Sequence, residues 1–412
     1  MLRLPGDKSI SHRYAMLAAI AEGSTRLENF ATGADCASTL ECMRALGASV
    51  SRTGDTVEIE GCGRELRAPE AALDCGNSGS TMRMLSGILA GQKFECELIG
   101  DESLSRRPMG RVIEPLEMMG AKVSAQQGRP PLKINGGGLR GITYKLPVAS
   151  AQVKSAVLFA GLFAEGETSV EEPLRTRDHT ELALRAFGVD VTRDGATARI
   201  RGGQTLSPVD TVIPGDISTA AFFLCAAAIL PESDLLLDGL LLNPTRAALL
   251  DAVVALGLKL SVTNVKEQHG ELTGAVHAQH GALNGLQLRG ASSAMLIDEL
   301  PVLAAVGPFT ETGVEIRDAR ELRVKESDRI AAVATNLRAM GAVVEEFEDG
   351  LRVPGRQKLH GARVNSFGDH RIAMAFAVAA LGAEGETFIE DADAARISFP
   401  QFFEILKRLV RS

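Results

Sequence analysis

Six runs of small and apolar residues recur along the 412-residue chain, and each follows a turn that contains Gly, Ser, Asn or Asp. Within each run the apolar positions repeat at helical spacing, and the preceding turn residues favour a helix start. The pattern therefore predicts six similar buried helices, at 11–23, 81–91, 153–166, 219–229, 299–307 and 371–385.

A second pattern follows most of these runs: a helix-like segment ends in a hydrophobic residue and Gly, and a short β-like run comes next. The glycines lie at 47, 120, 188, 257 and 341, at intervals of about 70 residues. Glycine at this step suits a helix C-terminus, where φ is often positive. The segments at 56–61 and 196–202 then alternate apolar and polar residues, which predicts hairpin strands with one solvated face. The last run is followed instead by a helix-like segment at 399–410.

One repeat is thus predicted to be a strand, a buried helix, a strand, a surface helix and two short strands, and six repeats account for the chain. Six α/β units of this size would form a solenoid, a closed ring or two domains of three repeats, and domain size favours two domains. A ligand site is then expected between the domains, where pockets are common. Gly/Pro breaks at 4–6 and 213–215 precede two of the buried helices and are candidate hinges.

The charge balance is acidic, with 44 Lys and Arg against 52 Asp and Glu, for a net charge of −8. This argues against nucleic-acid or membrane-surface partners, which favour a basic footprint. The longest apolar runs, 220–230 and 372–381, are shorter than the ~20 residues of a membrane helix, and the N-terminus lacks the features of a secretory signal. The six cysteines form no CxxC pair, which is typical of reduced, mostly buried thiols in a cytoplasmic protein.

No metal or cofactor motif is visible in the sequence. The seven histidines show no HExxH spacing, and there is no GxGxxG fingerprint. The segment at 5–13 is not a P-loop, because the upstream glycine that GxxxxGK(S/T) requires is missing. The glycine run at 136–138 is most simply a hairpin turn. We therefore expect neither a metal nor an organic cofactor.

The turns before the buried helices carry cations and hydroxyls. A helix N-terminus, with its unpaired N–H groups and positive dipole end, is a ready anion site. The residues concerned are Lys8, Ser9 and Arg13; Asn77, Ser78, Ser80 and Arg83; Ser150, Gln152 and Lys154; and Asp369, His370 and Arg371. These turns favour phosphate or carboxylate binding. The alternative is a set of solvated helix starts, with Ser9 as the N-cap of the first.

An arginine cluster follows, in which Arg106, Arg107 and Arg111 surround Pro108. Arginine suits bidentate binding of carboxylate or phosphate, although a single exposed cluster is more often solvated surface.

Two later segments carry candidate acids and bases. Segment 322–330 would place Lys325 and Arg329 on one helix face, with Ser327 as a cap and Glu326 able to move a proton. Asp298 begins an apolar helix and is interpreted as either an N-cap or a base.

Taken together, these motifs resemble the 5-enolpyruvylshikimate-3-phosphate synthase (3-phosphoshikimate 1-carboxyvinyltransferase) group of the enolpyruvyl transferase family. The segments are PGDKSISHR, GNSGSTMR, RRPM, SAQVKSA, TRDHTE, IDELP, RVKESDR and GDHRIAM, in this order from Pro5 to the FPQFF segment at 399–403. The resemblance implies an inside-out α/β fold of two similar domains, each of three βαβαββ units around a pseudo-three-fold axis. It implies one domain at 8–213 and a discontinuous one at 1–7 and 214–412, with the active site in the cleft between them.

The resemblance also implies a reaction, in which the enolpyruvyl group of phosphoenolpyruvate is transferred to the 5-hydroxyl of shikimate 3-phosphate through a tetrahedral adduct that releases phosphate. The implied shikimate 3-phosphate contacts are Lys8, Ser9, Arg13, Ser150, Ala151, Gln152, Arg177, Asp298 and Lys325. The implied phosphoenolpyruvate contacts are Lys8, Asn77, Gly79, Arg107, Gln152, Arg329 and Arg371. Asp298 or Lys325 would take the hydroxyl proton, Glu326 would protonate the methylene carbon, and cations such as Lys8 would stabilise the leaving phosphate.

Three positions bear on the family pattern. Ala151 stands where many members carry a second Ser, and Ile397 stands where some carry a Lys. The phosphoenolpyruvate clamp is therefore expected to use one cation fewer, or to use Arg396, which lies beside Ile397, as a substitute. Gly79 leaves space beside the phosphate of phosphoenolpyruvate, which suggests a glyphosate target.

Two alternatives stay open. A UDP-N-acetylglucosamine enolpyruvyl transferase would share the repeats but use a loop Cys, for which Cys96 is the nearest candidate. A non-catalytic anion-binding scaffold would keep the fold without the chemistry. Because the site is completed within one chain, we expect a monomer.

Overall fold

The computed structural model describes residues 1–410 and divides the chain into two compact units. Unit 1 comprises Met1–Pro5, Pro214–Glu267 and the chain from Leu272 onward, and unit 2 comprises Gly6–Ile213 and Gln268–Glu271. The chain therefore passes from one unit to the other within the two predicted Gly/Pro breaks. Relative to the predicted boundaries, unit 2 gains Gly6, Asp7 and the tetrapeptide at 268–271.

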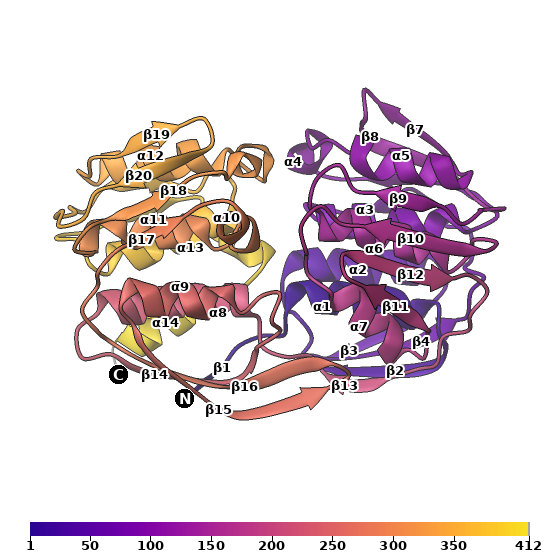
Figure 1. Cartoon of the computed structure of the whole chain (residues 1–412), viewed down its shortest axis with the longest axis horizontal. Helices are drawn as coiled ribbons and strands as arrows, with labels where there is room; N and C mark the ends of the chain where they lie inside the picture. Colours follow the sequence, from indigo (N-terminus) through magenta and orange to yellow (C-terminus); the bar gives the residue numbers. More distant parts are fainter. Residues whose placement is uncertain (411–412) are drawn as a thin grey trace. The chain divides into compact units, whose positions relative to one another are not determined.

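Unit 2 contains three four-stranded mixed sheets that share one topology (Figure 1). In each sheet the first two strands are parallel and the last two form an antiparallel hairpin. The sheets, in strand order, are β13 (Asp210–Val212), β2 (Glu22–Glu28), β4 (Thr56–Cys62) and β3 (Ser49–Thr53); β5 (Leu73–Asp74), β6 (Glu95–Ile99), β8 (Arg129–Asn135) and β7 (Lys122–Gln126); and β9 (Thr143–Lys145), β10 (Glu167–Glu171), β12 (Thr197–Arg201) and β11 (Val191–Asp194). The first strand of the first sheet comes from the end of the unit, so the chain returns to close that sheet.

The helices of unit 2 alternate with these strands. Inner helices precede the second strand of each sheet, and outer helices precede the hairpins. The inner helices are α1 (Lys8–Ala19), α3 (Gly79–Ala90) and α6 (Ala151–Gly161), and the others are α2 (Ala34–Ala45), α4 (Glu102–Ser105), α5 (Gly110–Met119) and α7 (His179–Ala186).

Unit 1 repeats this arrangement with one incomplete copy. Its sheets are β1 (Leu2–Arg3), β14 (Asp234–Leu241), β16 (Glu271–Gln279) and β15 (Lys259–Gln268); β17 (Leu286–Leu288), β18 (Val314–Ile316), β20 (Gly350–Val353) and β19 (Glu345–Phe347); and the two-stranded pair β21 (Arg363–Asn365) and β22 (Phe388–Glu390). Its helices are α8 (Ile217–Ile229), α9 (Ala248–Leu256), α10 (Ala291–Met295), α11 (Leu300–Val306), α12 (Arg329–Ala339), α13 (His370–Ala380) and α14 (Phe402–Val410), with 3₁₀ turns η1 (Gly307–Phe309), η2 (Arg320–Val324) and η3 (Ala392–Ile397). Helix α14 stands where the last hairpin would be, as the sequence predicted.

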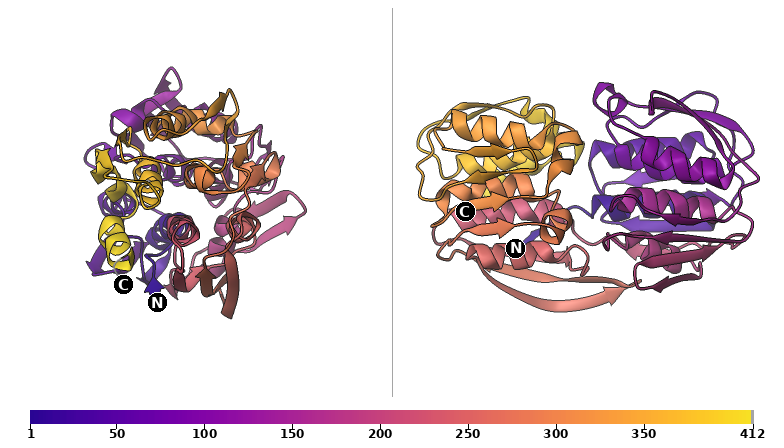
Figure 2. Two further views of the ribbon diagram at one scale, coloured as in Figure 1. Left: turned by 90° about the vertical axis from the view of Figure 1, so that its left-hand side faces the viewer. Right: turned by 45° about the horizontal axis from the view of Figure 1, so that its top comes forward.

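The six predicted apolar helices form the core of each unit. Helix α3 packs against α1 and α6 in unit 2, and α8, α11 and α13 pack against one another in unit 1. Figure 2 shows these helices inside and the sheets outside. Because such helices are covered on all sides, nearly all of their residues are buried, and this includes polar residues of α1 such as Arg13. Gly87 permits the closest approach: a Cβ there would lie 2.0 Å from the carbonyl oxygen of Ala156 on α6.

The local predictions have mixed outcomes. The helix-ending glycines all have positive φ, at Gly47 (107°), Gly120 (111°), Gly188 (82°), Gly257 (116°) and Gly341 (90°). The cysteines are free, and all except Cys62 are buried. The hairpin turn at 136–138 is wrong: this run follows β8 and leads to β9, and these two strands belong to different sheets. The tertiary path of the chain, rather than the local glycine pattern, decides this connection.

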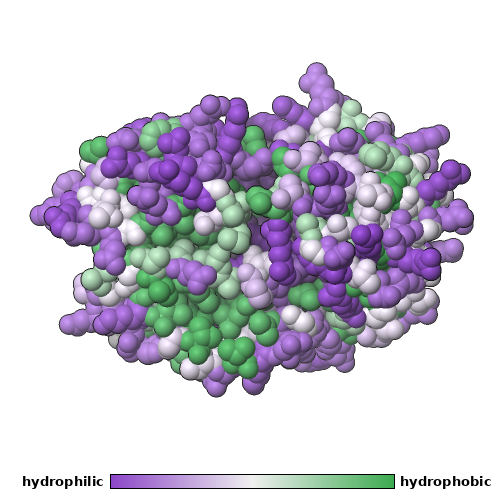
Figure 3. Space-filling view, in the orientation of Figure 1, coloured by the Kyte–Doolittle hydropathy of each residue, from purple (hydrophilic) through white to green (hydrophobic). Residues whose placement is uncertain are grey.

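Hydrophobic residues also reach the surface of unit 1 over α9, where Val254 is half exposed (Figure 3). No helix within residues 1–410 is long and apolar enough to cross a membrane.

Candidate active site

The inner helices of unit 2 begin in capped turns, and their first residues include most of the predicted anion ligands. Asp7 caps α1 by accepting from the backbone N–H of Ile10 at 2.9 Å. Ser78 caps α3 and Ser150 caps α6 in the same way, through the N–H groups of Thr81 and Val153. The prediction that Ser9 caps α1 is wrong, because Asp7 precedes it with a carboxylate in reach of the same turn. Ser9 is therefore left to other contacts.

Helix α1 carries three of the predicted residues. Lys8 is half-buried and pairs with Asp35 of α2, with 2.8 Å between Nζ and Oδ2. Arg13 is 2% exposed, and its guanidinium donates to Thr180, Ser155 and the backbone oxygen of Ser9. These contacts fix the Arg13 side chain in one position.

A second arginine lies close to the same turn. Arg177 donates to Ser9 Oγ at 3.4 Å. Burial, and after it the positive charge of Arg177, lowers the pKa of the Arg13 guanidinium to about 10. Two guanidinium groups beside one serine form a local excess of positive charge, which an anion would relieve. The structure thus brings together Ser9, Arg13 and Arg177, as the resemblance implied.

Three of the predicted phosphoenolpyruvate contacts of unit 2 lie together at the turn before α3. Arg107 is 7% exposed and donates from Nη2 to Asn77 Oδ1 at 2.7 Å, while the Asn77 amide donates to Asp101 Oδ2 at 2.7 Å. A Cβ on Gly79 would lie 3.3 Å from Nη1 of Arg107 and 2.9 Å from Nη1 of Arg83. Arg107, Asn77 and Gly79 are therefore neighbours. Arg106 instead pairs with Glu102 on the exposed side of α4.

Arg83 also belongs to this group, although the resemblance did not carry it into the predicted contacts. It donates to Gln152 Oε1 at 2.8 Å, and the Gln152 amide donates to Ser80 Oγ at 2.8 Å. These bonds join the first turns of α3 and α6. The signal in the sequence was the position of Arg83, one helical turn after Gly79. Ala151 lies beside Gln152 in the first turn of α6 and contributes no polar side chain.

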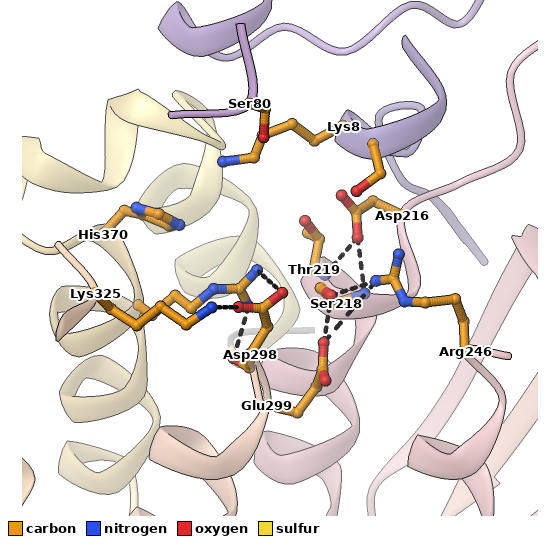
Figure 4. Close-up of polar contacts among 12 residues, drawn as sticks. Lys8, Ser80, Asp216, Ser218, Thr219, Arg246, Asp298, Glu299, Lys325 and His370 are labelled. Carbon is orange, nitrogen blue, oxygen red and sulfur yellow. Dashed lines mark hydrogen bonds and ion pairs between the residues drawn. The ribbon is translucent and has the colours of Figure 1, made fainter. Parts of the chain in front are cut away.

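In unit 1, one carboxylate lies among three cations. Asp298 Oδ1 is 3.5 Å from Nη1 of Arg329 and 3.9 Å from Nζ of Lys325, and Asp298 Oδ2 is 3.8 Å from Nη2 of Arg371. Arg371 also donates to the backbone oxygen of Asp298 at 2.8 Å. Figure 4 shows the side chains of Asp298 and Lys325 pointing toward one another. Asp298 does not cap α11, which has no side-chain cap bond. Of the two interpretations of Asp298, the cap is therefore wrong.

The predicted helical pairing of Lys325 and Arg329 is also wrong. Helix α12 begins at Arg329, and Lys325 precedes it in extended backbone. Asp328 rather than Ser327 caps the helix, and Ser327 donates to Asp369 instead. Both cations still reach Asp298, because the segment turns around it.

Arg329 occupies a different position from that of an open ligand clamp. It is 1% exposed and donates to Asp369 at 2.8 and 3.2 Å and to Glu326 at 2.6 Å. Burial opposes its charge, but Asp369 and Glu326 outweigh burial and raise the pKa of the guanidinium. Burial likewise opposes ionisation of Asp369, and Arg329 outweighs it and lowers the pKa of that carboxyl. Arg329 therefore organises the carboxylates of this segment.

A buried polar cluster directly beside Asp298 was not predicted. Ser218, in the first turn of α8, donates to the carboxylate of Glu299 and accepts from Arg246 at 2.5 Å (Figure 4). The three residues are 3–4% exposed. Nothing in the local sequence pairs Arg246 with Glu299, since they lie on different elements. The cluster anchors the residue that follows Asp298.

Arg396, which was predicted as a substitute for the Lys missing at position 397, lies at the surface. Arg396, in η3, is 71% exposed at its side chain and pairs with Asp393 at 3.0 Å. No group of three or more His, Cys, Asp or Glu side chains within residues 1–410 is arranged to hold a metal ion. The side chains gathered at the helix starts and around Asp298 carry cations, hydroxyls, amides and carboxylates.

Such an arrangement is typical of the α/β enzymes that act on anionic metabolites: cations and N–H groups gather at helix starts, and a carboxylate lies among cations.

Comparison with known proteins gives the particular family. The profile of the EPSP synthase (3-phosphoshikimate 1-carboxyvinyltransferase) family matches residues 1–406. The chain is 60% identical over 407 residues to a 3-phosphoshikimate 1-carboxyvinyltransferase of Koribacter versatilis, which covers 98% of this chain and 95% of the relative. It is 47% identical to the enzyme of that name from Geobacillus kaustophilus, over 100% of this chain and 97% of the relative. A solved EPSP synthase from Acinetobacter baumannii superposes with a TM-score of 0.88 at 43% identity, covering 99% of this chain and 95% of the other. The chain belongs to the EPSP synthase family, which confirms the resemblance seen in the motifs.

Proposed function

We propose that Asp298 and the cations around it carry the transfer of the enolpyruvyl group of phosphoenolpyruvate to the 5-hydroxyl of shikimate 3-phosphate, with release of phosphate through a tetrahedral adduct. The chain is a 3-phosphoshikimate 1-carboxyvinyltransferase, a transferase of the shikimate pathway that leads to aromatic amino acids. The observation that carries the mechanism is the carboxylate of Asp298 with Lys325, Arg329 and Arg371 within 3.9 Å.

The proton chemistry needs one base and one acid. Asp298 is half-buried and is not used as a helix cap, so its carboxylate can accept the hydroxyl proton, with Lys325 as the alternative acceptor. Glu326 is held by Arg329 at 2.6 Å, which orients its carboxyl group for delivery of a proton to the methylene carbon. Arg371 and Lys325 would then stabilise the charge of the adduct and the leaving phosphate.

Unit 2 supplies the remaining ligands in this proposal. Its three capped helix starts, together with the loops after α4 and before α7, hold Lys8, Ser9, Arg13, Ser150, Ala151, Gln152 and Arg177 for shikimate 3-phosphate, and Lys8, Asn77, Gly79, Arg107 and Gln152 for phosphoenolpyruvate. We place the three repeats of each unit around a pseudo-three-fold axis, since their shared sheet topology supports such an arrangement.

The alternative acceptor is UDP-N-acetylglucosamine, and an enzyme that acts on it would need a reactive Cys in a loop. The state of Cys96, the nearest candidate, disfavours this alternative. Cys96 lies in β6 rather than in a loop, and it is 6% exposed. Burial, and after it the charge of Glu95, raises the pKa of the Cys96 thiol to about 12. A thiol in this state is a poor nucleophile or acid at neutral pH.

The test is phosphate release from phosphoenolpyruvate, with shikimate 3-phosphate or UDP-N-acetylglucosamine as acceptor. We expect release with the shikimate ester alone, and loss of release in Asp298→Asn. Asp251→Asn is the matched control, because Asp251 is exposed on α9 of the same unit. Release with the nucleotide sugar alone would overturn the acceptor. Release with neither would favour the non-catalytic scaffold. Cytoplasmic location and a monomeric state stay predictions, which fractionation and sedimentation would check.

A further inference from the structure

A continuous series of hydrogen bonds links three helices in the interior of unit 2. His12 Nδ1 on α1 lies 2.7 Å from Thr39 Oγ1 on α2, and Thr39 Oγ1 lies 2.7 Å from Thr81 Oγ1 on α3. Thr81 Oγ1 in turn donates to Ser78 Oγ at 2.7 Å. All four residues have zero exposure. This series of hydrogen bonds therefore ends at Ser78, the N-cap of α3.

The direction of the donors follows from the last bond. Because Thr81 uses its single hydroxyl proton toward Ser78, it must accept from Thr39. Thr39 has then used its own proton, so its oxygen must accept from His12. His12 is therefore protonated at Nδ1.

The other ring nitrogen fits this assignment. Nε2 of His12 has no hydrogen-bond partner among residues 1–410, and with the proton on Nδ1 it is a bare acceptor rather than an unsatisfied N–H donor. Burial, followed by the charges of Lys8 and Arg13, also lowers the pKa of His12 well below its ordinary value, so the ring is neutral at physiological pH. A neutral His12 with its proton on Nδ1 is thus the first donor in a series in which each group donates to the next, as far as Ser78.

From this geometry we infer that His12, Thr39 and Thr81 are positioning residues that hold the first turn of α3, and with it Asn77 and Gly79, in register with the first turn of α1. The inference rests on the proposed function, in which Asn77 and Gly79 contact phosphoenolpyruvate. Ser78, the end of the chain, lies directly between these two residues. Each polar group in this series of hydrogen bonds is buried. A buried polar network stabilises only the arrangement in which every group has its hydrogen-bond partner.

Two of these helices, α1 and α2, are joined a second time nearer the surface. Lys8 of α1 pairs with Asp35 of α2 at 2.8 Å, and Thr39 lies one helical turn further along α2. Removal of these inner hydrogen bonds therefore leaves α1 and α2 joined by the ion pair, while α3 loses its hydrogen-bonded link to α2 and keeps only packing contacts. We accordingly expect the defect to appear at the α3 turn rather than at the α1 turn.

The first test is steady-state kinetics of the full chain with Thr81→Val, which keeps the shape and the backbone N–H that binds Ser78 but removes the hydroxyl. Since small misplacements at an active site are costly in rate and binding, we expect the KM for phosphoenolpyruvate to rise roughly tenfold, with the KM for shikimate 3-phosphate changed less than about twofold. Thr81→Ser is the matched control, because it restores the hydroxyl and should return both constants to those of the parent. Thr39→Val should reproduce the effect of Thr81→Val.

The second test is the protonation of the His12 ring, read from ¹⁵N chemical shifts of histidine-labelled protein. We expect the neutral Nδ1–H form in the parent and a changed tautomer population in Thr39→Val. An Nε2–H or doubly protonated ring in the parent at neutral pH would refute the assigned direction of the hydrogen bonds and overturn the inference. Valine variants that melt earlier but keep both KM values would show a purely structural role and overturn the inference as well. An inactive parent with a correct His12 tautomer would instead count against the proposed function.

Discussion

Replacement of Arg329 by Met should destabilise unit 1 strongly. Arg329 is 1% exposed, and its guanidinium neutralises Asp369, which is fully buried, through bonds of 2.8 and 3.2 Å. Methionine fills similar volume but leaves the Asp369 carboxylate without its main counter-charge. Loss of one partner of a buried pair costs about 3–5 kcal/mol of unfolding free energy. For a unit of this size, 1 kcal/mol shifts the melting temperature by roughly 2–4 °C, so a drop on the order of 10 °C is expected.

The assay is calorimetry together with urea unfolding of the full chain, and two variants sharpen it. Arg396→Met is the matched control: its ion pair with Asp393 is exposed, so it should change stability by no more than about 0.5 kcal/mol. Addition of Asp369→Asn to Arg329→Met should recover part of the loss, because the uncompensated charge is removed. The loss should also be smaller at acidic pH, where Asp369 of the variant takes up a proton. A loss below about 1 kcal/mol would refute the buried-charge reasoning and favour an open ligand clamp.

Three further outcomes are expected. Asp298→Asn should lower kcat by roughly 10²- to 10⁴-fold with melting unchanged, since it removes a general base; phosphate-release kinetics within a few-fold of the parent would contradict that role. Gly79→Ala should raise the KM for phosphoenolpyruvate without loss of stability, because the new Cβ meets only the flexible ends of Arg83 and Arg107; an unchanged KM would show that the turn does not face this substrate. Stability should fall as pH drops below about 6.5, by up to about 1.4 kcal/mol per pH unit, because unfolded His12 takes up a proton while the folded, pKa-lowered ring does not; urea titrations in which His12→Asn keeps the full slope would disprove this.

Local features of the fold were predictable because their causes are local. A glycine at a helix C-terminus answers a backbone requirement within a few residues, and Gly47 and Gly257 show the expected positive φ. The apolar runs located all six inner helices for the same reason, since helical periodicity is set by neighbours three and four residues apart. The repeat count and the order of motifs then led to the family.

The capping residues show where local reasoning becomes insufficient. Ser9 and Ser327 have the right chemistry for an N-cap, but Ser9 lies inside α1 and Ser327 lies one residue before the cap position of α12. Asp7 and Asp328 occupy the cap positions themselves. Asp298 likewise has cap chemistry, and its actual neighbours are cations from later segments. Residue type alone does not choose between such candidates, because the chosen one depends on where the helix begins.

The amino-acid sequence by itself determined the repeats, the inner helices and the set of polar residues at their starts. Only the tertiary structure decided which charges meet. Arg371 reaches Asp298 across 73 residues, Arg329 reaches Asp369 across 40, and His12 reaches Thr39 across 27. The physical reason is that a buried ion pair or hydroxyl chain is satisfied by whichever partner the packing of distant elements brings within about 3 Å, and no local pattern encodes that distance.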